Sequence, residues 1–265
     1  MSYQVLSRKL RPQHFDKVVG QMHVTRTLQN AIGLDRVAHG YIFSGPRGVG
    51  KTTTARILAK VLNCKNPVEN NPCGTCINCK EITQGSSLDV QELDGASNRG
   101  IDEMRDLREA VKYPPNSGKY RIYIIDEVHM LTREAFNALL KTLEEPPAHV
   151  IFIMATTDAH KVPTTILSRT QRFDFKPISI NDISDYLIQI LKTENIKYDA
   201  EGIRLIAQKA AGSLRDALSL LDQVIAYSND SLDVETMRDI LGIIKENVYL
   251  NIIKTIEKRD NKKVI

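Results

Sequence analysis

The sequence predicts a parallel α/β domain with a five-stranded sheet, followed by a smaller helical domain. Nearly continuous apolar runs alternate with helical patterns in the first part of the chain, which is typical of parallel strands buried on both faces. After Pro177 the strand signal stops and only helical patterns remain. A length of 265 residues is enough for about two such domains.

Five short segments are predicted to be strands. They cover residues 41–44, 88–93, 121–126, 150–155 and 171–175. Between them, apolar residues recur at helical spacing in segments that contain Leu58, Leu107 and Leu139. Strands that alternate with helices imply right-handed crossover connections, and therefore a parallel sheet.

The helical part of the chain begins after residue 178. Asn181 and Asp199 are predicted to cap two helices, and Ser213-Leu-Arg-Asp216 resembles a capping box before a third. We therefore expect one domain over residues 1–178 and a helical domain over 179–242. A further helix is expected from Ile243, so residues 243–265 would be the start of a third domain that the chain ends too early to complete.

The composition is that of an ordinary globular protein. Hydrophobic residues make up 42% and charged residues 26%, which excludes wholesale disorder. No apolar run approaches the length of a membrane span, and the N-terminus lacks the apolar core of a signal peptide, so we expect a cytoplasmic protein without a membrane partner. The net charge of +4 is too mild to indicate a nucleic-acid binder by itself.

The loop after the first strand carries the strongest chemical signal. It matches the pattern Gly-x4-Gly-Lys-[Ser/Thr], in which glycines let backbone N–H groups cradle phosphate oxygens at a helix N-terminus. The lysine reaches the β- and γ-phosphates, and the first threonine places its hydroxyl on Mg²⁺. The nucleotide-binding residues predicted here are Gly45, Pro46, Arg47, Gly48, Val49, Gly50, Lys51, Thr52 and Thr53.

Two carboxylates follow the third predicted strand. Asp126 is expected to hold Mg²⁺ together with Thr52, and Glu127 to orient or deprotonate an attacking water. The alternative is an ordinary acidic strand end. Combined with the phosphate loop, the pair predicts hydrolysis of a nucleoside triphosphate, with Lys51, Asp126 and Glu127 as catalytic residues.

Three further residues are weaker candidates. Thr157 follows the fourth strand, where its hydroxyl could sense the γ-phosphate or simply cap the strand end. Arg169 could stabilise transition-state charge in a neighbouring subunit, although a lone arginine is more often a solvated surface residue. Arg215 lies at the start of a predicted helix, where the helix dipole disfavours a cation, and this hints at an anionic partner.

Four cysteines lie within sixteen residues: Cys64, Cys73, Cys76 and Cys79. Four thiolates suit tetrahedral Zn²⁺ and leave no open position, so the sequence predicts a structural zinc site inserted at about residues 64–79. Asn71-Pro72 and Gly74 supply turn-forming residues between the cysteines. The alternatives are four unrelated cysteines or a redox Cys-x2-Cys pair.

Taken together, these motifs resemble those of the bacterial DNA polymerase III gamma/tau subunits, the motor subunits of the sliding-clamp loader among the AAA+ ATPases. The resemblance covers essentially the whole chain, and the cysteine insertion is its most specific mark. The matching segments are the N-terminal Val18-Val-Gly-Gln21, the phosphate loop, the four-cysteine insertion, Asp126-Glu-Val-His-Met130, Asn137 to Pro147 and Gly212-Ser-Leu-Arg-Asp-Ala-Leu218.

The resemblance assigns roles to the weaker candidates. Thr157 matches the family's sensor 1 threonine and Arg215 its sensor 2 arginine. Arg169 matches the arginine finger that acts on a neighbouring subunit, although Thr170 stands where the family pattern has cysteine. The resemblance also implies an adenine pocket lined by Arg11, Pro12 and Val19 and closed by Leu214 from the helical lid.

The resemblance further implies partners. It indicates a five-membered ring with other clamp-loader subunits, a sliding clamp, primer–template DNA and the DNA polymerase III holoenzyme, whose polymerase activity resides in another subunit. ATP and Mg²⁺ would drive the ring, with Zn²⁺ in a structural role. Arg99 and Arg105 would contact the DNA backbone, although a solvated helix start explains them equally well.

Two other functions fit parts of the sequence. Asp126-Glu-Val-His129 also reads as a helicase box, but helicases need a second α/β domain where this chain predicts helices. A non-catalytic scaffold is a further alternative, which the intact Lys51, Asp126 and Glu127 disfavour.

Overall fold

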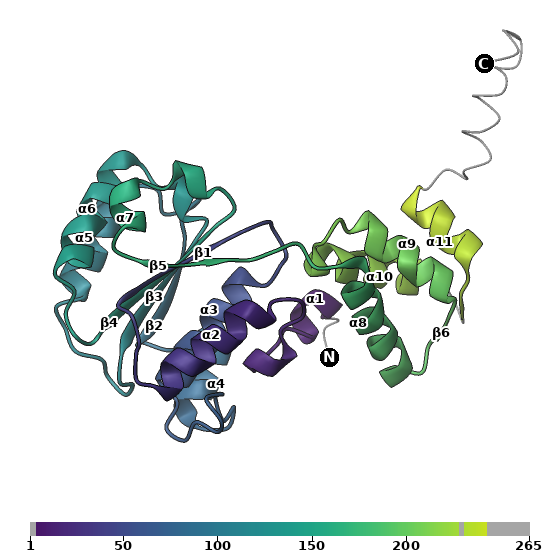
Figure 1. Ribbon diagram of the computed structural model, residues 1–265, viewed down its shortest axis with the longest axis horizontal. Coiled ribbons are helices and arrows are strands. Elements are labelled where there is room, and N and C mark those ends of the chain that lie inside the picture. Colours follow the sequence, from purple (N-terminus) through teal and green to yellow (C-terminus); the bar gives the residue numbers. More distant parts are fainter. Residues whose placement is uncertain (1–3, 228–230, 243–265) are drawn as a thin grey trace, which may run out of the picture.

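A five-stranded parallel sheet lies at the centre of the larger lobe of the computed structural model, which describes residues 4–227 and 231–242 (Figure 1). The strand order is β2–β3–β4–β1–β5. The prediction of five parallel strands is confirmed, with ends that differ by at most two residues. The strands are β1 Gly40–Ser44, β2 Val90–Asp94, β3 Arg121–Asp126, β4 Val150–Thr156 and β5 Gln171–Asp174.

Helices cover both faces of this sheet (Figure 1). On one face Ile122 and Ile124 pack with apolar residues of α2 and α3, and on the other Tyr123 and Ile125 pack with those of α5 and α6. Burial on both faces explains why the inner strands β1, β3 and β4 read as apolar runs, whereas the edge strands β2 and β5 are partly exposed and mix polar with apolar residues. The helices of this lobe are α1 Leu6–Lys9, η1 Phe15–Lys17, α2 Met22–Gly33, α3 Lys51–Leu62, α4 Ile77–Gln84, α5 Ile101–Ala110, η2 Val128–Met130, α6 Arg133–Glu144, η3 Ala159–Lys161 and α7 Thr164–Leu167.

The smaller lobe is a bundle of helices with its own apolar core. The core includes Leu187, Ile203 and Leu221, and Leu6 of α1 packs into it from the N-terminal end of the chain. The backbone N–H of Leu6 also donates a hydrogen bond to the Asp222 carboxylate at 2.7 Å. The helices of this lobe are α8 Ile180–Thr193, α9 Ala200–Lys209, α10 Leu214–Tyr227 and α11 Val234–Leu241.

Two sequence predictions for this lobe are wrong. It is not purely helical, because β6 Lys197–Tyr198 and β7 Ser231–Leu232 form a small parallel sheet. The first helix is capped by Ser179, whose hydroxyl accepts from the Asp182 N–H, and not by Asn181, which lies inside the helix. The Asp199 cap is confirmed. The expected helix at 243–265 lies outside the described residues.

Half of the predicted capping box is present at the start of α10. The Ser213 hydroxyl accepts from the Asp216 N–H at 3.3 Å, as a helix cap does, whereas the Ser213 N–H donates to the carbonyl of Ala210. This places Leu214 and Arg215 in the first turn of the helix, facing the larger lobe.

The segment between the lobes is held by main-chain and side-chain hydrogen bonds. The fully buried Gln21 amide donates to the Lys176 carbonyl at 2.7 Å and accepts from the Lys176 N–H at 3.2 Å. Phe175 N–H donates to the Ser44 carbonyl at 2.7 Å, and Ile178 N–H donates to the Gly212 carbonyl at 3.0 Å. The linker is therefore anchored to both lobes.

Nothing in the described part of the chain could cross a bilayer as a helix, because no helix there is both long and apolar enough.

Candidate active site

The candidate active site lies where the carboxyl ends of β1, β3 and β4 face the smaller lobe. Parallel strands bring these ends to one edge of the sheet, which is where ligands bind in such folds. A pocket opens there between the phosphate loop, the N-terminal segment and α10. The predicted residues that line it are Arg11, Pro12, Val19, Arg47, Gly48, Val49, Gly50, Lys51, Thr52, Thr53, Asp126, Glu127, Leu214 and Arg215.

The backbone of the phosphate loop has the conformation that its glycines allow. Gly48 and Gly50 have φ values of 76° and 103°, which L side chains rarely adopt, and α3 begins immediately after Gly50. A Cβ at Gly48 would lie 2.0 Å from the Ser213 Oγ of the smaller lobe. The loop thus touches the start of α10 directly and presents the N-terminal end of α3 to the pocket.

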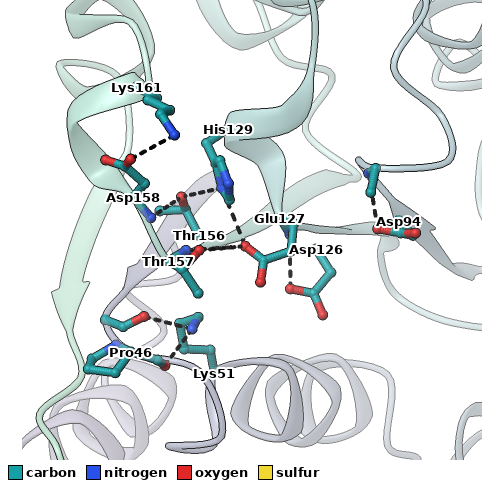
Figure 2. Close-up of polar contacts among 12 residues, drawn as sticks. Pro46, Lys51, Asp94, Asp126, Glu127, His129, Thr156, Thr157, Asp158 and Lys161 are labelled. Atoms are coloured by element: carbon teal, nitrogen blue, oxygen red, sulfur yellow. Dashed lines mark hydrogen bonds and ion pairs between the residues drawn. The ribbon is translucent and has the colours of Figure 1, made fainter.

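Lys51 is held inside the loop. Its Nζ donates hydrogen bonds to the Gly45 and Pro46 carbonyls, both at 2.7 Å (Figure 2). Burial lowers the pKa of Lys51, while the nearby charges of Glu127 and Asp126 partly oppose that shift. A buried ammonium at the N-terminal end of α3 is well placed to bind phosphate oxygens.

Thr52 and Asp126 form a pair of oxygen ligands. The Thr52 hydroxyl donates to Asp126 Oδ2 at 2.7 Å, and Asp126 Oδ1 accepts from the Glu127 N–H at 3.0 Å. A hydroxyl and a carboxylate side by side are the donor set that Mg²⁺ prefers. The residues therefore fit the cation that the sequence predicts, held between Thr52 and Asp126.

The Glu127 carboxylate is fixed by the end of β4. Its Oε2 accepts hydrogen bonds from the Thr157 hydroxyl at 3.0 Å and the Thr157 N–H at 3.3 Å (Figure 2). Glu127 itself has a φ of 46°, a left-handed conformation that turns the chain sharply after β3. The structure thus brings the predicted base and the predicted sensor into direct contact.

Sequence reasoning missed the contribution of His129. Its Nδ1 lies 3.3 Å from Glu127 Oε2 and 3.0 Å from the Thr156 hydroxyl, which in turn accepts from the Asp158 N–H (Figure 2). The signal was present in Asp126-Glu-Val-His129, a motif that indicates the family and resembles a helicase box but assigns no role to the histidine. His129 is a positioning residue for the Glu127 carboxylate.

Positive charge gathers on the side of the pocket formed by the N-terminal segment and α10. Burial, and then the positive charge of Arg56, lowers the pKa of Arg11; Arg215 adds to this effect, and Glu92 opposes it. The Arg215 N–H donates to the Gly48 carbonyl at 3.4 Å. An anionic ligand would relieve the repulsion between these guanidinium groups.

Three predicted residues lie away from this pocket. Arg169 pairs with Glu144 at 2.9 Å and donates to the Thr165 carbonyl at 2.8 Å. Arg99 donates to the Ala96 carbonyl at 2.7 Å, and Arg105 pairs with Asp102 at 3.2 Å. The structure therefore does not bring these arginines to the site within a single chain.

The four cysteines are gathered at one point between α3 and α4. Their Sγ atoms all lie within 4.8 Å of one another, and none forms a disulfide. Backbone N–H groups of Cys73 and Cys76 donate to the sulfurs of Cys64 and Cys73 at 3.2 and 3.3 Å. Hydrogen bonds from the backbone of Cys76 and Thr75 lower the pKa of Cys73 to about 5. Four clustered sulfurs with N–H donors fit a tetrahedral zinc ion.

The turn inside this insertion differs from the prediction. Gly74 has the expected positive φ of 71°, but the second turn is made by Glu69 and Asn70, with φ values of 48° and 58°. Asn71 instead pairs with Val68 through two backbone hydrogen bonds of 2.8 and 2.9 Å. The result is a two-residue hairpin between Cys64 and Cys73.

Comparisons with known proteins agree with this site. A family model described as "DNA polymerase III, delta subunit" matches residues 20–179, and one described as "DNA polymerase III clamp loader subunit, ATPase lid domain" matches residues 182–230. The DNA polymerase III subunit gamma of Buchnera aphidicola subsp. Baizongia pistaciae is 44% identical over all of this chain and 72% of its own length. The chain belongs to the DNA polymerase III gamma/tau family.

Longer members of the gamma/tau family are equally similar. The tau subunit of Bacillus subtilis is 51% identical over 98% of this chain and 46% of its own length. The tau subunit of Escherichia coli is 48% identical over 100% of this chain and 41% of its own length. The chain therefore spans less than half the length of these tau relatives.

Solved structures show the fold. The Thermotoga maritima RuvB Holliday junction branch migration motor has a TM-score of 0.64 at 18% identity and covers 93% of this chain and 79% of its own. The chain thus has the AAA+ type of P-loop fold with an ATPase lid. The lid model is described as part of a clamp loader subunit, and these relatives are named as subunits of DNA polymerase III.

We expect the cysteine cluster of this gamma/tau chain to stabilise the larger lobe when zinc is bound. Removing zinc with a selective chelator should lower the Tm by roughly 10 °C, because a tightly bound ion contributes about 4 kcal/mol to stability. Differential scanning calorimetry with elemental analysis tests this. The Cys79→Ser variant should already melt early and respond little to the chelator. A wild-type protein that contains no zinc and keeps its Tm would contradict the prediction.

Proposed function

We propose that this chain is the ATP-hydrolysing motor subunit of a sliding-clamp loader that acts on primed DNA within the DNA polymerase III holoenzyme. The proposal rests on one observation: Lys51, Asp126 and Glu127 line the same pocket, and Arg215 of the smaller lobe lines it as well. The proposed units are an AAA+ ATPase domain (1–178) with its zinc insertion, a helical lid (179–242) and the start of an oligomerising collar (243–265). We place the protein in the cytoplasm.

In this proposal the pocket binds ATP between the two lobes. Arg11, Pro12 and Val19 line the side for the adenine, with Leu214 closing from the lid. The phosphate loop and Lys51 hold the phosphates. Mg²⁺ between Thr52 and Asp126 would neutralise charge on the β- and γ-phosphate oxygens. The Glu127 carboxylate takes a proton from the attacking water, and Thr157 and His129 keep that carboxylate in place.

The position of Arg169 supports a role between subunits. It lies on the α7–β5 connection, away from the pocket of its own chain, and pairs there with a single exposed carboxylate, Glu144. An arginine so placed is available to a neighbour in a five-membered ring, where it would stabilise charge on the transferred phosphoryl group. Arg99 and Arg105 are proposed to contact the DNA backbone, because Arg99 lies just before α5 and Arg105 lies on its exposed face.

The proposed cycle couples these parts. ATP binding at subunit interfaces arranges the ring to open the clamp, and primer–template DNA then aligns Glu127, Thr157 and the neighbour's finger. Hydrolysis weakens the ring and releases the closed clamp. The test is ATP hydrolysis by the reconstituted loader, which should rise when clamp and primed DNA are both added. No stimulation by either would overturn the proposal.

A helicase function is not supported. Such an enzyme requires a second α/β domain to supply arginines, and the residues that the structure describes contain one large sheet and a helical lobe. Lys51, Asp126 and Glu127 also share one pocket, which argues against a non-catalytic scaffold.

We expect Arg169→Ala to separate binding from hydrolysis. ATP affinity should stay within about twofold, because the side chain lies outside the pocket of its own chain. Stimulated hydrolysis in the assembled loader should fall by about 10³-fold, the lower end for loss of an arginine finger. Arg172→Ala is the matched control, since Arg172 is an exposed arginine three residues further along that is also ion-paired, with Asp174 at 2.8 Å. Full hydrolysis by the isolated chain would contradict the assignment.

A further inference from the structure

The cysteine insertion is in direct contact with one wall of the nucleotide pocket. This wall is residues 11–19, which we call the pocket-wall segment. Its ends line the pocket through Arg11, Pro12, Val18 and Val19. Its middle turns away from the pocket and packs against α3, α4 and the hairpin that lies between Cys64 and Cys73. The segment is therefore a bridge between the cysteine cluster and the pocket.

Asn71 makes the central contact of this bridge. Its Oδ1 accepts from the Phe15 N–H at 3.0 Å, and its Nδ2 donates to Asp16 Oδ2 at 2.8 Å. Asn71 is 7% exposed and Phe15 is 1% exposed, so the hydrogen bond between them is sheltered from water, whereas the bond to Asp16 is only partly buried. A single amide thus holds two successive residues of the segment, just before Val18 reaches the pocket.

Two other contacts join the same parts. The buried Lys60 of α3 donates to Gln13 Oε1, and the Thr83 hydroxyl of α4 donates to the same oxygen at 3.5 Å. Gln13 follows directly after Arg11 and Pro12. The segment is consequently fixed on both sides of its bend, by α3 and α4 near Gln13 and by the hairpin at Phe15 and Asp16.

The cysteine cluster determines where Asn71 lies. The hairpin runs from Cys64 to Cys73, so its two ends meet at the sulfurs, and Asn71 is two residues from Cys73. The turn uses two non-glycine residues with positive φ, Glu69 and Asn70, which is a costly conformation for a free loop. Closing the loop at the metal removes most of the freedom that the hairpin would otherwise have.

We propose that the cysteine insertion holds the pocket-wall segment in its nucleotide-binding position through Asn71, so that occupancy of the four-cysteine cluster by zinc sets the affinity for nucleotide. The inference rests on the proposed function, since it takes the pocket to bind ATP. Asn71 is a positioning residue here: it touches no nucleotide and acts through Phe15 and Asp16. The four cysteines fix the position of Asn71, and Asn71 fixes the position of the pocket-wall segment.

The experiment measures the equilibrium affinity of the purified full chain for a fluorescent, non-hydrolysable ATP analogue. Asn71→Ala should weaken binding about tenfold, the effect of leaving buried donors and acceptors without partners. Asn66→Ala, the same change at an exposed position of the insertion, should have no effect. Circular dichroism and the Tm without nucleotide confirm that each variant is folded.

A pair exchange separates positioning from loss of stability. Asn71→Asp alone places two carboxylates against each other and should weaken binding as much as Asn71→Ala. The double variant Asp16→Asn/Asn71→Asp reverses donor and acceptor, keeps an oxygen for the Phe15 N–H, and should restore the affinity to within about threefold. Failure of the double variant to recover any affinity would overturn the role of this contact.

Zinc removal completes the test. Chelation should weaken nucleotide binding about tenfold in the wild type but less than about twofold further in Asn71→Ala, because both changes act through the same contact. Equal losses in both proteins, or wild-type affinity in Asn71→Ala, would overturn the inference. If the zinc-loaded wild type binds the analogue no better than Lys51→Ala, the proposed function itself fails, which is a distinct result.

Discussion

Glu127→Gln should reduce ATP hydrolysis by about 10²- to 10⁴-fold while nucleotide affinity stays close to that of the wild type. The substitution keeps the size of the side chain and leaves an amide oxygen to accept from the Thr157 hydroxyl, now 3.0 Å from Glu127 Oε2. The substitution removes only the carboxylate charge that lets residue 127 take a proton from water. Single-turnover hydrolysis by the reconstituted loader, alongside analogue binding, measures both quantities.

Glu145→Gln serves as the control for this variant. Glu145 is exposed at the end of α6, so the same loss of charge there should leave hydrolysis unchanged. Hydrolysis by Glu127→Gln at more than a tenth of the wild-type rate would show that another group activates the water.

Lys51→Ala should weaken ATP binding and lower hydrolysis by about 10²- to 10³-fold, the usual cost of losing one preorganised charge at a reacting group. The ammonium is the cation at the centre of the phosphate loop, only 6% exposed and beside Asp126 and Glu127. Without it these carboxylates would face the phosphates uncompensated. Equilibrium titration and steady-state hydrolysis test the two effects separately.

The control for the lysine variant is Lys209→Ala. Lys209 is an exposed residue at the end of α9, so its substitution removes the same charge from a position that does not line the pocket. An Lys51→Ala protein that binds ATP with wild-type affinity would mean that the phosphates lie elsewhere.

The sheet and phosphate loop were predictable because their signals are local. The three inner strands are nearly continuous apolar runs, as for Ile122 to Ile125, and the loop pattern specifies its own backbone through Gly48 and Gly50. The four cysteines were predictable as a cluster for the same reason. Their small separation in sequence limits how far apart they can lie.

The features that sequence reasoning missed depend on distant partners. β6 and β7 are two residues each, too short to show a pattern, and are specified only by pairing across the smaller lobe. Ser179 and Asn181 are both good caps in isolation, and the packing of α8 decides between them. The role of Asn71 is invisible in sequence because Phe15 and Asp16 lie 56 and 55 positions away.

The anchored linker gives the smaller lobe a mechanical property. Phe175 is hydrogen-bonded to β1, Lys176 to Gln21 and Ile178 to Gly212, so a rotation of the smaller lobe would have its fulcrum near Pro177. That fulcrum adjoins the phosphate loop, since a Cβ at Gly45 would lie 2.3 Å from the Phe175 carbonyl oxygen. Rotation about this point would therefore move the residues near the phosphate loop little and would move α11, at the far end of the lobe, much more (Figure 1).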